Sequence, residues 1–401
     1  MSVLPTTTLT NSLLNNTLAS NTLATTTLPT AGFSFSVQAQ DGPARAGVLG
    51  TPHGCVLTPT FMPVGTQGSV KSLSPGEVAG TGARIVLGNT YHLWIRPGPE
   101  VISELGGLHG FTKWPHVMLT DSGGFQAFSL QGLVKLSEDG FSFRSHVDGS
   151  PMHLSPEEAM RVQGMIGADI AMQLDVCPPG DADELTVRAA MDRTSRWADR
   201  CLAARRSDQA VFGIVQGGVR VGLRREHART ISGFPFDGLA LGGFSVGEPI
   251  DKMHEVLMEV GPELDFGRPH YLMGVGTPLD LVMGVGAGVD MFDCVMPTRN
   301  ARNGQALLRH GRVVIKNAKY RRDSRPIDEG CCCECCSGGY SRAYLRHLYL
   351  AGEMLVLRLL SLHNLHVYAQ LMADCRRAIV DGVFGAFFRD FVQAGGADDV
   401  E

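Results

Sequence analysis

The sequence predicts an α/β protein built as a closed parallel (β/α)8 barrel. Eight short apolar runs are separated by stretches with helical patterns, and eight parallel strands are the number that closes such a barrel. Polar residues and glycines follow these runs, as expected where strand ends converge on one face. A doubly wound open sheet is the competing arrangement, because it has the same alternation of strands and helices.

The candidate strands and helices can be placed in order along the chain. Ser155-Pro-Glu-Glu158 has the pattern of a helix start and predicts a helix that continues over Ala159 to Ile166. The segment Val134 to His153 alternates apolar and polar residues around Glu138-Asp139-Gly140, which predicts a hairpin inserted after the third strand. The eight predicted strands are Val56 to Met62, Arg84 to Leu87, His116 to Thr120, Asp169 to Leu174, Val211 to Val215, Gly238 to Leu241, His270 to Met273 and Val289 to Phe292.

Length and composition limit the class of protein. The chain has 401 residues, of which 44% are hydrophobic and 19% charged, and these values fit a globular protein with one large domain and an appendage. The sequence contains no run of about 18 consecutive apolar residues, so it predicts no membrane-spanning helix. The first basic residue is Arg45, so the positive start of a secretory signal is missing and we expect a cytoplasmic protein.

Carboxylates at the predicted strand ends suggest a reaction. A single aspartate there is most often a helix N-cap, but Asp121, Asp175 and Asp293 all follow predicted strands, with Gln216 after another. Cleavage of a glycosidic bond needs one carboxylate as nucleophile and a second group that moves protons. Asp121 and Asp293 are the candidates for these two roles.

The same strand ends carry residues that suit a planar base. Asp121-Ser-Gly-Gly-Phe-Gln126 combines open backbone amides with the flat face of Phe125. Asp175 and Gln216 offer the acceptor and donor types that read the edge of a purine-like ring. Gly242 and Gly243 give backbone groups close access to a ligand. Composition alone permits other ligands here.

The charge of the chain is unevenly distributed. The formal net charge is −5, yet the stretch from Arg299 to Arg325 has nine Lys or Arg residues and one acid, Asp323. This stretch is either a phosphate-binding surface or the solvated face of a hairpin.

A cysteine cluster near the C-terminus predicts a metal site. Cys331, Cys333 and Cys336 give a Cys-x-Cys-x-x-Cys pattern, and His363 follows on a predicted helix. Three thiolates and an imidazole form a closed tetrahedral zinc site, which predicts one structural ion. Cys332 and Cys335 are alternatives in register, and His366 is the rival of His363.

Several long motifs resemble one family. From about Gly32 to Val392 the chain is similar to bacterial tRNA-guanine transglycosylase, also called queuine tRNA-ribosyltransferase. The matching motifs are Pro63-Val-Gly-Thr-Gln67, Leu87-Gly-Asn-Thr-Tyr-His92, Asp121-Ser-Gly-Gly-Phe-Gln126, Gly213-Ile-Val-Gln-Gly-Gly218, Tyr271-Leu-Met-Gly-Val-Gly276, Gly288 to Gly304 around Asp293, and Ser341-Arg-Ala-Tyr-Leu-Arg-His347.

The resemblance implies an irregular (β/α)8 TIM barrel with a zinc-binding insertion near the C-terminus. The implied divisions are a disordered Thr/Leu/Asn-rich tail at 1–31, a catalytic barrel at 32–392 that includes a basic hairpin and zinc subdomain at 305–366, and a flexible tail at 393–401. A homodimer is also implied, with Tyr344 and His347 near its interface.

The implied activity is exchange of the wobble guanine in tRNAs with GUN anticodons, those for Asp, Asn, His and Tyr. Asp293 is the implied nucleophile, forming a covalent bond to ribose in a double displacement, and Asp121 the general acid/base. The implied base-binding residues are Ser122, Phe125, Asp175, Gln216, Gly242, Gly243, Met273 and Gly274. The implied contacts to the tRNA anticodon loop come from Gly274, Val275, Gly276, Thr277, Asp280, Thr298, Arg299, Asn300, Ala301 and Arg302.

The resemblance also suggests the incoming base. Cys177 and Val246 match the bacterial pattern, which goes with 7-aminomethyl-7-deazaguanine in queuosine biosynthesis. Phe244 departs from the family, because leucine is more usual after the double glycine, and the segment after Cys336 is one residue longer than the family spacing. A glycoside hydrolase-like barrel and a noncatalytic tRNA-binding subunit are the alternative functions; the first leaves the basic stretch unexplained and the second leaves the two aspartates unexplained.

Overall fold

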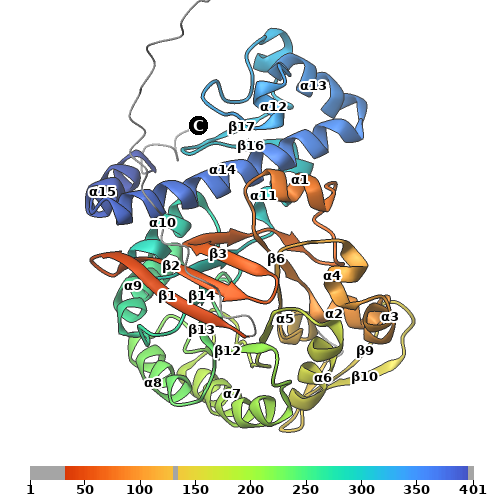
Figure 1. The fold of residues 1–401 in the computed structure, drawn as a ribbon, viewed down its shortest axis with the longest axis vertical. Helices are drawn as coiled ribbons and strands as arrows, with labels where there is room; N and C mark the ends of the chain where they lie inside the picture. Colours follow the sequence, from red (N-terminus) through yellow and green to blue (C-terminus); the bar gives the residue numbers. More distant parts are fainter. Residues whose placement is uncertain (1–31, 130–133, 396–401) are drawn as a thin grey trace, which may run out of the picture.

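The chain folds around a parallel sheet that closes into a barrel (Figure 1). The structure is a computed structural model, and it describes residues 32–129 and 134–395. The strand order is β4-β15-β14-β13-β12-β11-β7-β6-β5. The first and last of these, β4 and β5, flank Pro63 in one run of chain; β4 pairs with β15 and β5 pairs with β6. They therefore act as one strand, which confirms the eight-stranded barrel and excludes the open sheet.

Helices follow most of the barrel strands and pack around them. The barrel strands are β4 (Thr60–Met62), β5 (Val64–Gly65), β6 (Ile85–Gly88), β7 (Val117–Thr120), β11 (Ile170–Met172), β12 (Ala210–Val215), β13 (Gly238–Leu241), β14 (His270–Leu272) and β15 (Met291–Asp293). The helices around them are α1 (Pro75–Gly80), α2 (Thr90–Ile95), α3 (Pro99–Glu104), α4 (Gly107–Thr112), α5 (Gly124–Ser129), α6 (Pro156–Ile166), α7 (Glu184–Ala204), α8 (Val221–Ser232), α9 (Ile250–Val260), η1 (Gly261–Glu263) and α10 (Pro278–Gly286).

The two-residue period of the strands separates two cores. On β12, Phe212 and Ile214 belong to the cluster that fills the barrel, whereas Val211 and Val215 belong to the cluster between the barrel and its helices. Alternate residues of a strand point to opposite faces, so each strand supplies both cores. This is why all six residues of β12 are buried and why the run reads as continuously apolar.

The first predicted strand is wrong as a single element. Val56 to Met62 is divided at Pro59, which has no backbone N–H for a sheet ladder. The part before Pro59 is β3 (Gly54–Thr58), which pairs antiparallel with β2 (Ala44–Thr51), and β2 pairs with β1 (Ser34–Asp41). The sequence did not predict this three-stranded sheet.

The N-terminal sheet covers the end of the barrel at which the strands begin. Leu49 and Val56 join the cluster inside the barrel. Arg45, which is 1% exposed, donates from Nε to Oδ1 of Asp290 at 3.1 Å, and Asp290 directly precedes β15. A buried, hydrogen-bonded ion pair thus joins this sheet to the barrel floor.

The predicted insertion after the third strand is present as a three-stranded antiparallel sheet. Its strands are β8 (Lys135–Leu136), β9 (Phe141–Arg144) and β10 (Pro151–Leu154), in the order β10-β9-β8. The helix that was expected to follow it is α6, and the Ser155 hydroxyl caps that helix by accepting a hydrogen bond from Glu158 N at 3.1 Å.

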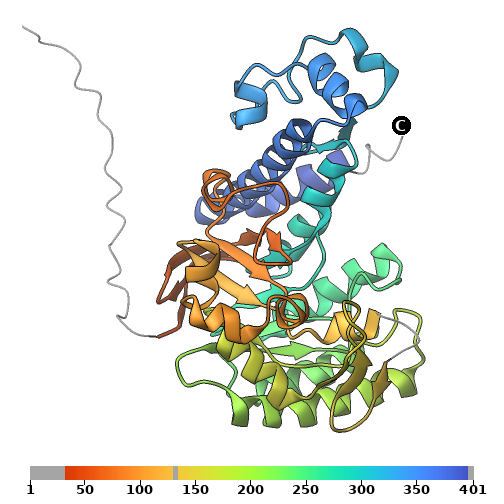
Figure 2. The same ribbon diagram turned by 90° about the vertical axis from the view of Figure 1, so that its right-hand side faces the viewer.

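A C-terminal subdomain stands on one side of the barrel, and a long helix joins the two (Figures 1 and 2). The helix α14 contacts β1, β2 and β4 as well as elements of the subdomain. No helix in the described part of the chain, α14 included, has the length and hydropathy to cross a membrane. The elements of this region are α11 (Met296–Arg302), β16 (Gln305–Leu307), β17 (Arg312–Val314), η2 (Ala318–Arg322), α12 (Glu334–Ser337), α13 (Arg342–Ala351), α14 (Met354–Val380) and α15 (Phe384–Gly395).

The predicted terminal tails fall mostly outside this description. Residues 1–31 lie outside the described residues, as do residues 396–401. Residues 393–395, which the sequence assigned to a flexible tail, belong to α15.

Candidate active site and metal site

Both predicted catalytic aspartates and most of the predicted base-binding residues meet in one cleft at the carboxyl ends of the barrel strands. The cleft has a volume of about 1960 Å³ and is open to solvent. Asp121 follows β7, Asp175 follows β11 and Asp293 ends β15, and all three line it. The other predicted base-binding residues that line it are Ser122, Phe125, Gly242, Gly243, Met273 and Gly274.

Asp121 is held by the loop that follows β6. Asn89 Nδ2 donates to its Oδ2 at 2.5 Å, and the backbone N–H of Thr90 donates to its Oδ1 at 2.8 Å. Burial, with a smaller contribution from the negative charge of Asp293, raises the pKa of Asp121 to about 7 against the opposing hydrogen bonds. A carboxyl group with this pKa can both give and take a proton near neutral pH.

Asp293 has a different set of donors. The Tyr271 hydroxyl donates to Oδ1 at 2.6 Å, and the backbone N–H of Gly274 donates to the same oxygen at 2.7 Å. Burial raises the pKa of Asp293, while these two donors favour its ionised form. The charge of Asp293 acts on Asp121, so the two carboxyl groups are electrostatically coupled across the cleft.

Asp175 and Gln216 form a second polar pair deeper in the barrel. Gln216 Nε2 donates to Asp175 Oδ2 at 2.6 Å, and the Ser122 hydroxyl lies 3.4 Å from Oδ1. Burial raises the pKa of Asp175 to about 6. Gln216 is fully buried, and its Oε1 has no hydrogen-bond partner among the described residues. A buried acceptor in this position is suited to a group that donates a hydrogen bond.

Gly243 has to be glycine in this arrangement. Its φ is +65°, and a Cβ at this position would lie 2.3 Å from Gln216 Oε1. The absence of a side chain therefore lets the backbone of residue 243 approach the same polar pair.

The predicted tRNA-binding residues divide into two groups. Gly274, Gly276, Thr277, Asp280 and Arg299 line the cleft. The side chains of Val275 and Ala301 are fully buried and that of Thr298 is largely buried, so any contact from Val275 or Ala301 has to come from backbone atoms. Asn300 and Arg302 lie on α11 beyond the cleft lining.

Sequence reasoning gave no role to three residues that hold the two aspartates. In the sequence, Asn89, Thr90 and Tyr271 stand out only as members of two of the matching motifs. The alternation of side chains along β14 could have predicted that Tyr271 faces the site. Leu272 packs toward the helices, so Tyr271 and Met273 on either side of it face the barrel interior.

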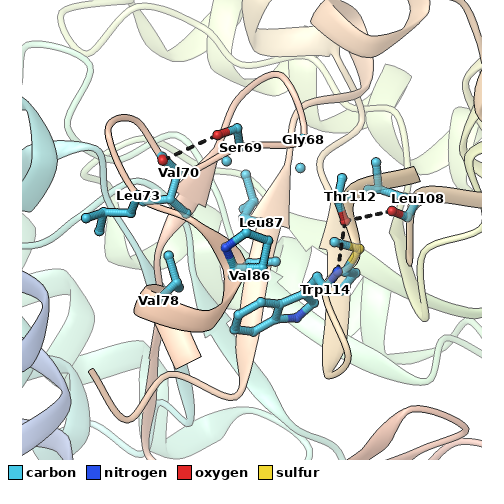
Figure 3. A pocket seen from close by; sticks show the side chains of 14 residues that line it. Gly68, Ser69, Val70, Leu73, Val78, Val86, Leu87, Leu108, Thr112 and Trp114 are labelled. Carbon is cyan, nitrogen blue, oxygen red and sulfur yellow. Dashed lines mark hydrogen bonds between the residues drawn. The ribbon is translucent and has the colours of Figure 1, made fainter. Parts of the chain in front are cut away.

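An apolar cavity of about 560 Å³ lies between β5, β6 and β7 and the helices α1 and α4 (Figure 3). Its wall includes Val70, Leu73, Val78 and Trp114, and it contains no titratable side chain. The Thr112 hydroxyl at its edge donates to Leu108 O at 2.7 Å within the protein. This cavity has no group that could act on a substrate, and the candidate active site is the cleft with the aspartates.

The cysteine cluster and His363 come together as predicted. The distances from His363 Nδ1 to the Sγ atoms of Cys331, Cys333 and Cys336 are 3.6, 3.5 and 3.4 Å. An S–N edge of a tetrahedral zinc site measures about 3.6 Å for the usual bond lengths. His363 Nε2 lies 2.9 Å from Leu307 O, which orients the ring with Nδ1 toward the sulfurs. These four residues can hold a metal ion, and their donor set is consistent with zinc.

Two of the rival ligands, Cys332 and His366, are set apart from this cluster, whereas Cys335 is buried beside Cys336 but does not belong to the group of four ligand atoms. Cys332 is exposed, and its Sγ lies 3.4 Å from His366 Nε2. The register among the neighbouring cysteines, which the sequence left open, is thus decided by which thiols face His363.

A second group of potential ligands does not have the geometry of a metal site. Ligand atoms of His53, His109 and Asp169 lie within 4.8 Å of one another at the opposite end of the barrel. The two imidazole rings are stacked, with centroids 3.5 Å apart and planes 10° apart. Imidazole lone pairs lie in the ring plane, and one ion cannot lie in both planes. His53 Nδ1 instead hydrogen-bonds Asp169 Oδ1 at 2.7 Å.

Replacement of Cys333 by serine should lower metal content and thermal stability together. Loss of one thiolate weakens a site whose binding energy contributes to folding by several kcal/mol. Metal content by atomic absorption and melting temperature should both fall. Cys332→Ser is the matched control and should leave both unchanged. If Cys332→Ser lost the metal and Cys333→Ser kept it, the assignment of the ligands would be wrong.

Comparison with known proteins shows the family of the chain. The sequence profile of the family described as queuine tRNA-ribosyltransferase matches residues 40–396. A queuine tRNA-ribosyltransferase of Sorangium cellulosum is 67% identical over 368 residues, which cover 92% of this chain and 93% of that protein. One of Neisseria meningitidis serogroup C is 52% identical over 360 residues (89% and 97%), and one of Herpetosiphon aurantiacus is 51% identical over 361 residues (90% and 92%).

The match covers the barrel, the cleft and the cysteine cluster together, and the relatives share it over nearly their whole length. The chain therefore belongs to the queuine tRNA-ribosyltransferase family, and it is a pentosyltransferase of the tRNA-guanine transglycosylase type.

Proposed function

We propose that the enzyme exchanges the wobble guanine of tRNAs with GUN anticodons, those for Asp, Asn, His and Tyr, for 7-aminomethyl-7-deazaguanine in queuosine biosynthesis. The observation that carries this proposal is the pair of coupled aspartates in one cleft, Asp293 buried and Asp121 partly buried, beside a buried acceptor at Gln216. The two aspartates suit exchange of a glycosidic bond, and the acceptor of Gln216 suits recognition of a base.

In the first half of the reaction, Asp293 attacks C1′ of the wobble ribose. A C1′–O bond forms as the C1′–N9 bond breaks, and guanine leaves with the electron pair. Tyr271 and Gly274 hold Asp293 by Oδ1, so the carboxylate can attack with its other oxygen. The RNA backbone stays intact while the tRNA is bound covalently.

Asp121 handles the protons of both halves. It donates a proton to the departing guanine and then accepts the proton of the incoming base. N9 of the incoming base attacks C1′ and displaces Asp293, which restores both carboxyl groups. A pKa of about 7 suits a group that has to be protonated in one half-reaction and ionised in the other.

The departing and the incoming base would occupy the same site in turn. Asp175 and Gln216 would hold its polar edge, and Gly243 would contribute backbone groups beside them. Phe125 and Met273 would stack on its faces, with Ser122 adjacent. Cys177 and Val246 also line the cleft and would contact the substituent of the incoming base.

The tRNA anticodon loop would lie across Gly274 to Asp280 and the α11 segment Thr298 to Arg302. Arg299 lines the cleft and can reach a phosphate or a base next to the wobble position. The basic stretch from Arg299 to Arg325 would extend this surface and contact phosphate groups of the anticodon loop.

The metal site would hold one structural zinc ion per subunit through Cys331, Cys333, Cys336 and His363. A closed set of four ligands supplies folding energy and no catalytic step. We also propose a homodimer. Tyr344 on α13 is 42% exposed and Met354 on α14 is 81% exposed, which leaves apolar surface on this subdomain for a second copy.

Radiolabelled guanine should be incorporated into unmodified tRNA with a GUN anticodon. A transcript with adenine at the wobble position is the control and should incorporate none, because adenine has a different pattern of donors and acceptors. Absence of incorporation by folded, metal-loaded enzyme would overturn the proposed exchange, and sugar hydrolysis without tRNA would indicate a glycoside hydrolase instead.

Asp293→Asn should abolish the covalent tRNA adduct that is trapped by denaturing electrophoresis. The carboxamide is a poor nucleophile, whereas noncovalent tRNA binding depends on other contacts and should remain close to wild type. Asp121→Asn should lower turnover by roughly 10²- to 10⁴-fold while metal content and folding are retained. An adduct that persists in Asp293→Asn would place the nucleophile at another residue.

The pH profile of kcat/KM for tRNA should fall on both sides of a maximum. The alkaline limb reports Asp121, which has to be protonated before guanine leaves, so the rate should decrease as pH rises through about 7. The acid limb reports Asp293, which has to be ionised. Asn89→Ala removes a donor to the ionised Asp121, raises its pKa and should move the alkaline limb to higher pH. A limb that moved to lower pH would contradict this assignment.

A further inference from the structure

Arg224 is a buried arginine without a carboxylate partner in the described part of the chain. It lies on α8, is 0% exposed, and forms none of the ion pairs of that part. Its guanidinium instead donates to three backbone carbonyls, with Nε to Gly218 O at 2.7 Å, Nη1 to Val215 O at 3.1 Å and Nη2 to Gly243 O at 3.2 Å. Burying a cation without an opposite charge costs free energy, and here hydrogen bonds to carbonyl groups offset part of that cost.

The three carbonyls belong to the two loops that carry the base-recognition residues. Val215 directly precedes Gln216 at the end of β12, and Gly243 follows β13. Arg224 packs closely on the first loop, because a Cβ at Gly217 would lie 2.9 Å from Arg224 Cγ. A single side chain therefore sets the position of the Gln216 loop relative to the Gly243 loop.

Phe244 completes this arrangement. Its ring centroid lies 3.7 Å from Arg224 Cζ, and the ring is buried at the border of the cleft. Burial lowers the pKa of Arg224 to about 9, against the attraction of Cys177 and Glu248. The negative face of an aromatic ring offsets part of the cost of the buried charge, which an aliphatic side chain at this position would not do.

We propose that Arg224, with Phe244 stacked on it, is a positioning residue that fixes the Gly242 to Phe244 loop for binding of the base. This inference rests on the proposed function of the cleft. Arg224 contacts none of the reacting atoms, and it acts through the backbone of Gly243 and the loop that carries Gln216.

The planar fork of arginine is needed for this role. Its N–H groups point in several fixed directions and reach carbonyls on two loops at once, whereas a lysine ammonium is a single point donor. Arg224→Lys keeps the positive charge and removes the fork. The loops that carry Gln216 and Gly243 should then no longer be held at a fixed distance from each other. The base should therefore bind more weakly.

The test is steady-state guanine exchange by the full-length metal-loaded enzyme, with guanine and tRNA varied in turn. Arg224→Lys should raise the KM for guanine by roughly 10-fold or more, since hydrogen bonds from a charged donor are lost, and should leave the KM for tRNA within about twofold. Phe244→Leu keeps an apolar side chain and should raise the KM for guanine by about threefold. Phe244→Leu therefore tests the inference independently if Arg224→Lys folds poorly.

Arg45→Lys is the matched control, because Arg45 is also a fully buried arginine and lies at the opposite end of the barrel. It should lower the melting temperature and leave the KM for guanine unchanged. An unchanged KM for guanine in both Arg224→Lys and Phe244→Leu would overturn the inference. So would a pattern like that of Arg45→Lys, with stability lowered and no selective effect on guanine.

Calorimetric titration of the same proteins with guanine separates this inference from the proposed function. If wild-type enzyme failed to exchange guanine, the proposed reaction would be wrong. Guanine affinity would still decide the role of Arg224, with weaker binding by Arg224→Lys supporting it and equal binding overturning it.

Discussion

Burial of carboxyl groups at one end of a closed barrel is the constraint on which the chemistry of this protein depends. Asp121, Asp175 and Asp293 follow different strands, and burial raises the pKa of each. In water all three would be ionised at neutral pH. The barrel reduces their contact with water and gives each its own hydrogen-bond donors, so groups of the same type acquire different protonation behaviour.

These donors come from neighbouring strands, which links the site to barrel closure. Asn89 and Thr90 follow β6 and hold Asp121 after β7, while Tyr271 on β14 holds Asp293 on β15. Each aspartate is positioned by the strand next to its own. In an open sheet the strands at the two edges would lie far apart. Closure through β4 and β5 instead brings the carboxyl ends of all the strands into one ring.

The far end of the barrel and the C-terminal subdomain provide mechanical support. The N-terminal sheet closes the floor with an apolar face and the ion pair of Arg45 with Asp290. On the other side, α14 contacts the barrel and also carries His363, which lies among the three cysteines. A metal bound there would fix the basic segment against a helix that already packs on the barrel, and so would place a proposed RNA-binding surface next to the cleft.

The sequence by itself determined the architecture, the cleft residues and the metal cluster. Apolar runs of strand length followed by Asp, Gln or Gly predict strand ends on one face, and three of the four metal-ligand candidates stand within six consecutive residues. These signals are local in the chain. The tertiary structure alone decided which side chains meet: the division of the first strand at Pro59, the donors to each aspartate, the register of the cysteines around His363, and the contact of Arg224 with Phe244. Each of these depends on atoms that folding brings together from separate elements, and a pKa or a hydrogen bond is a property of that environment rather than of the residue type.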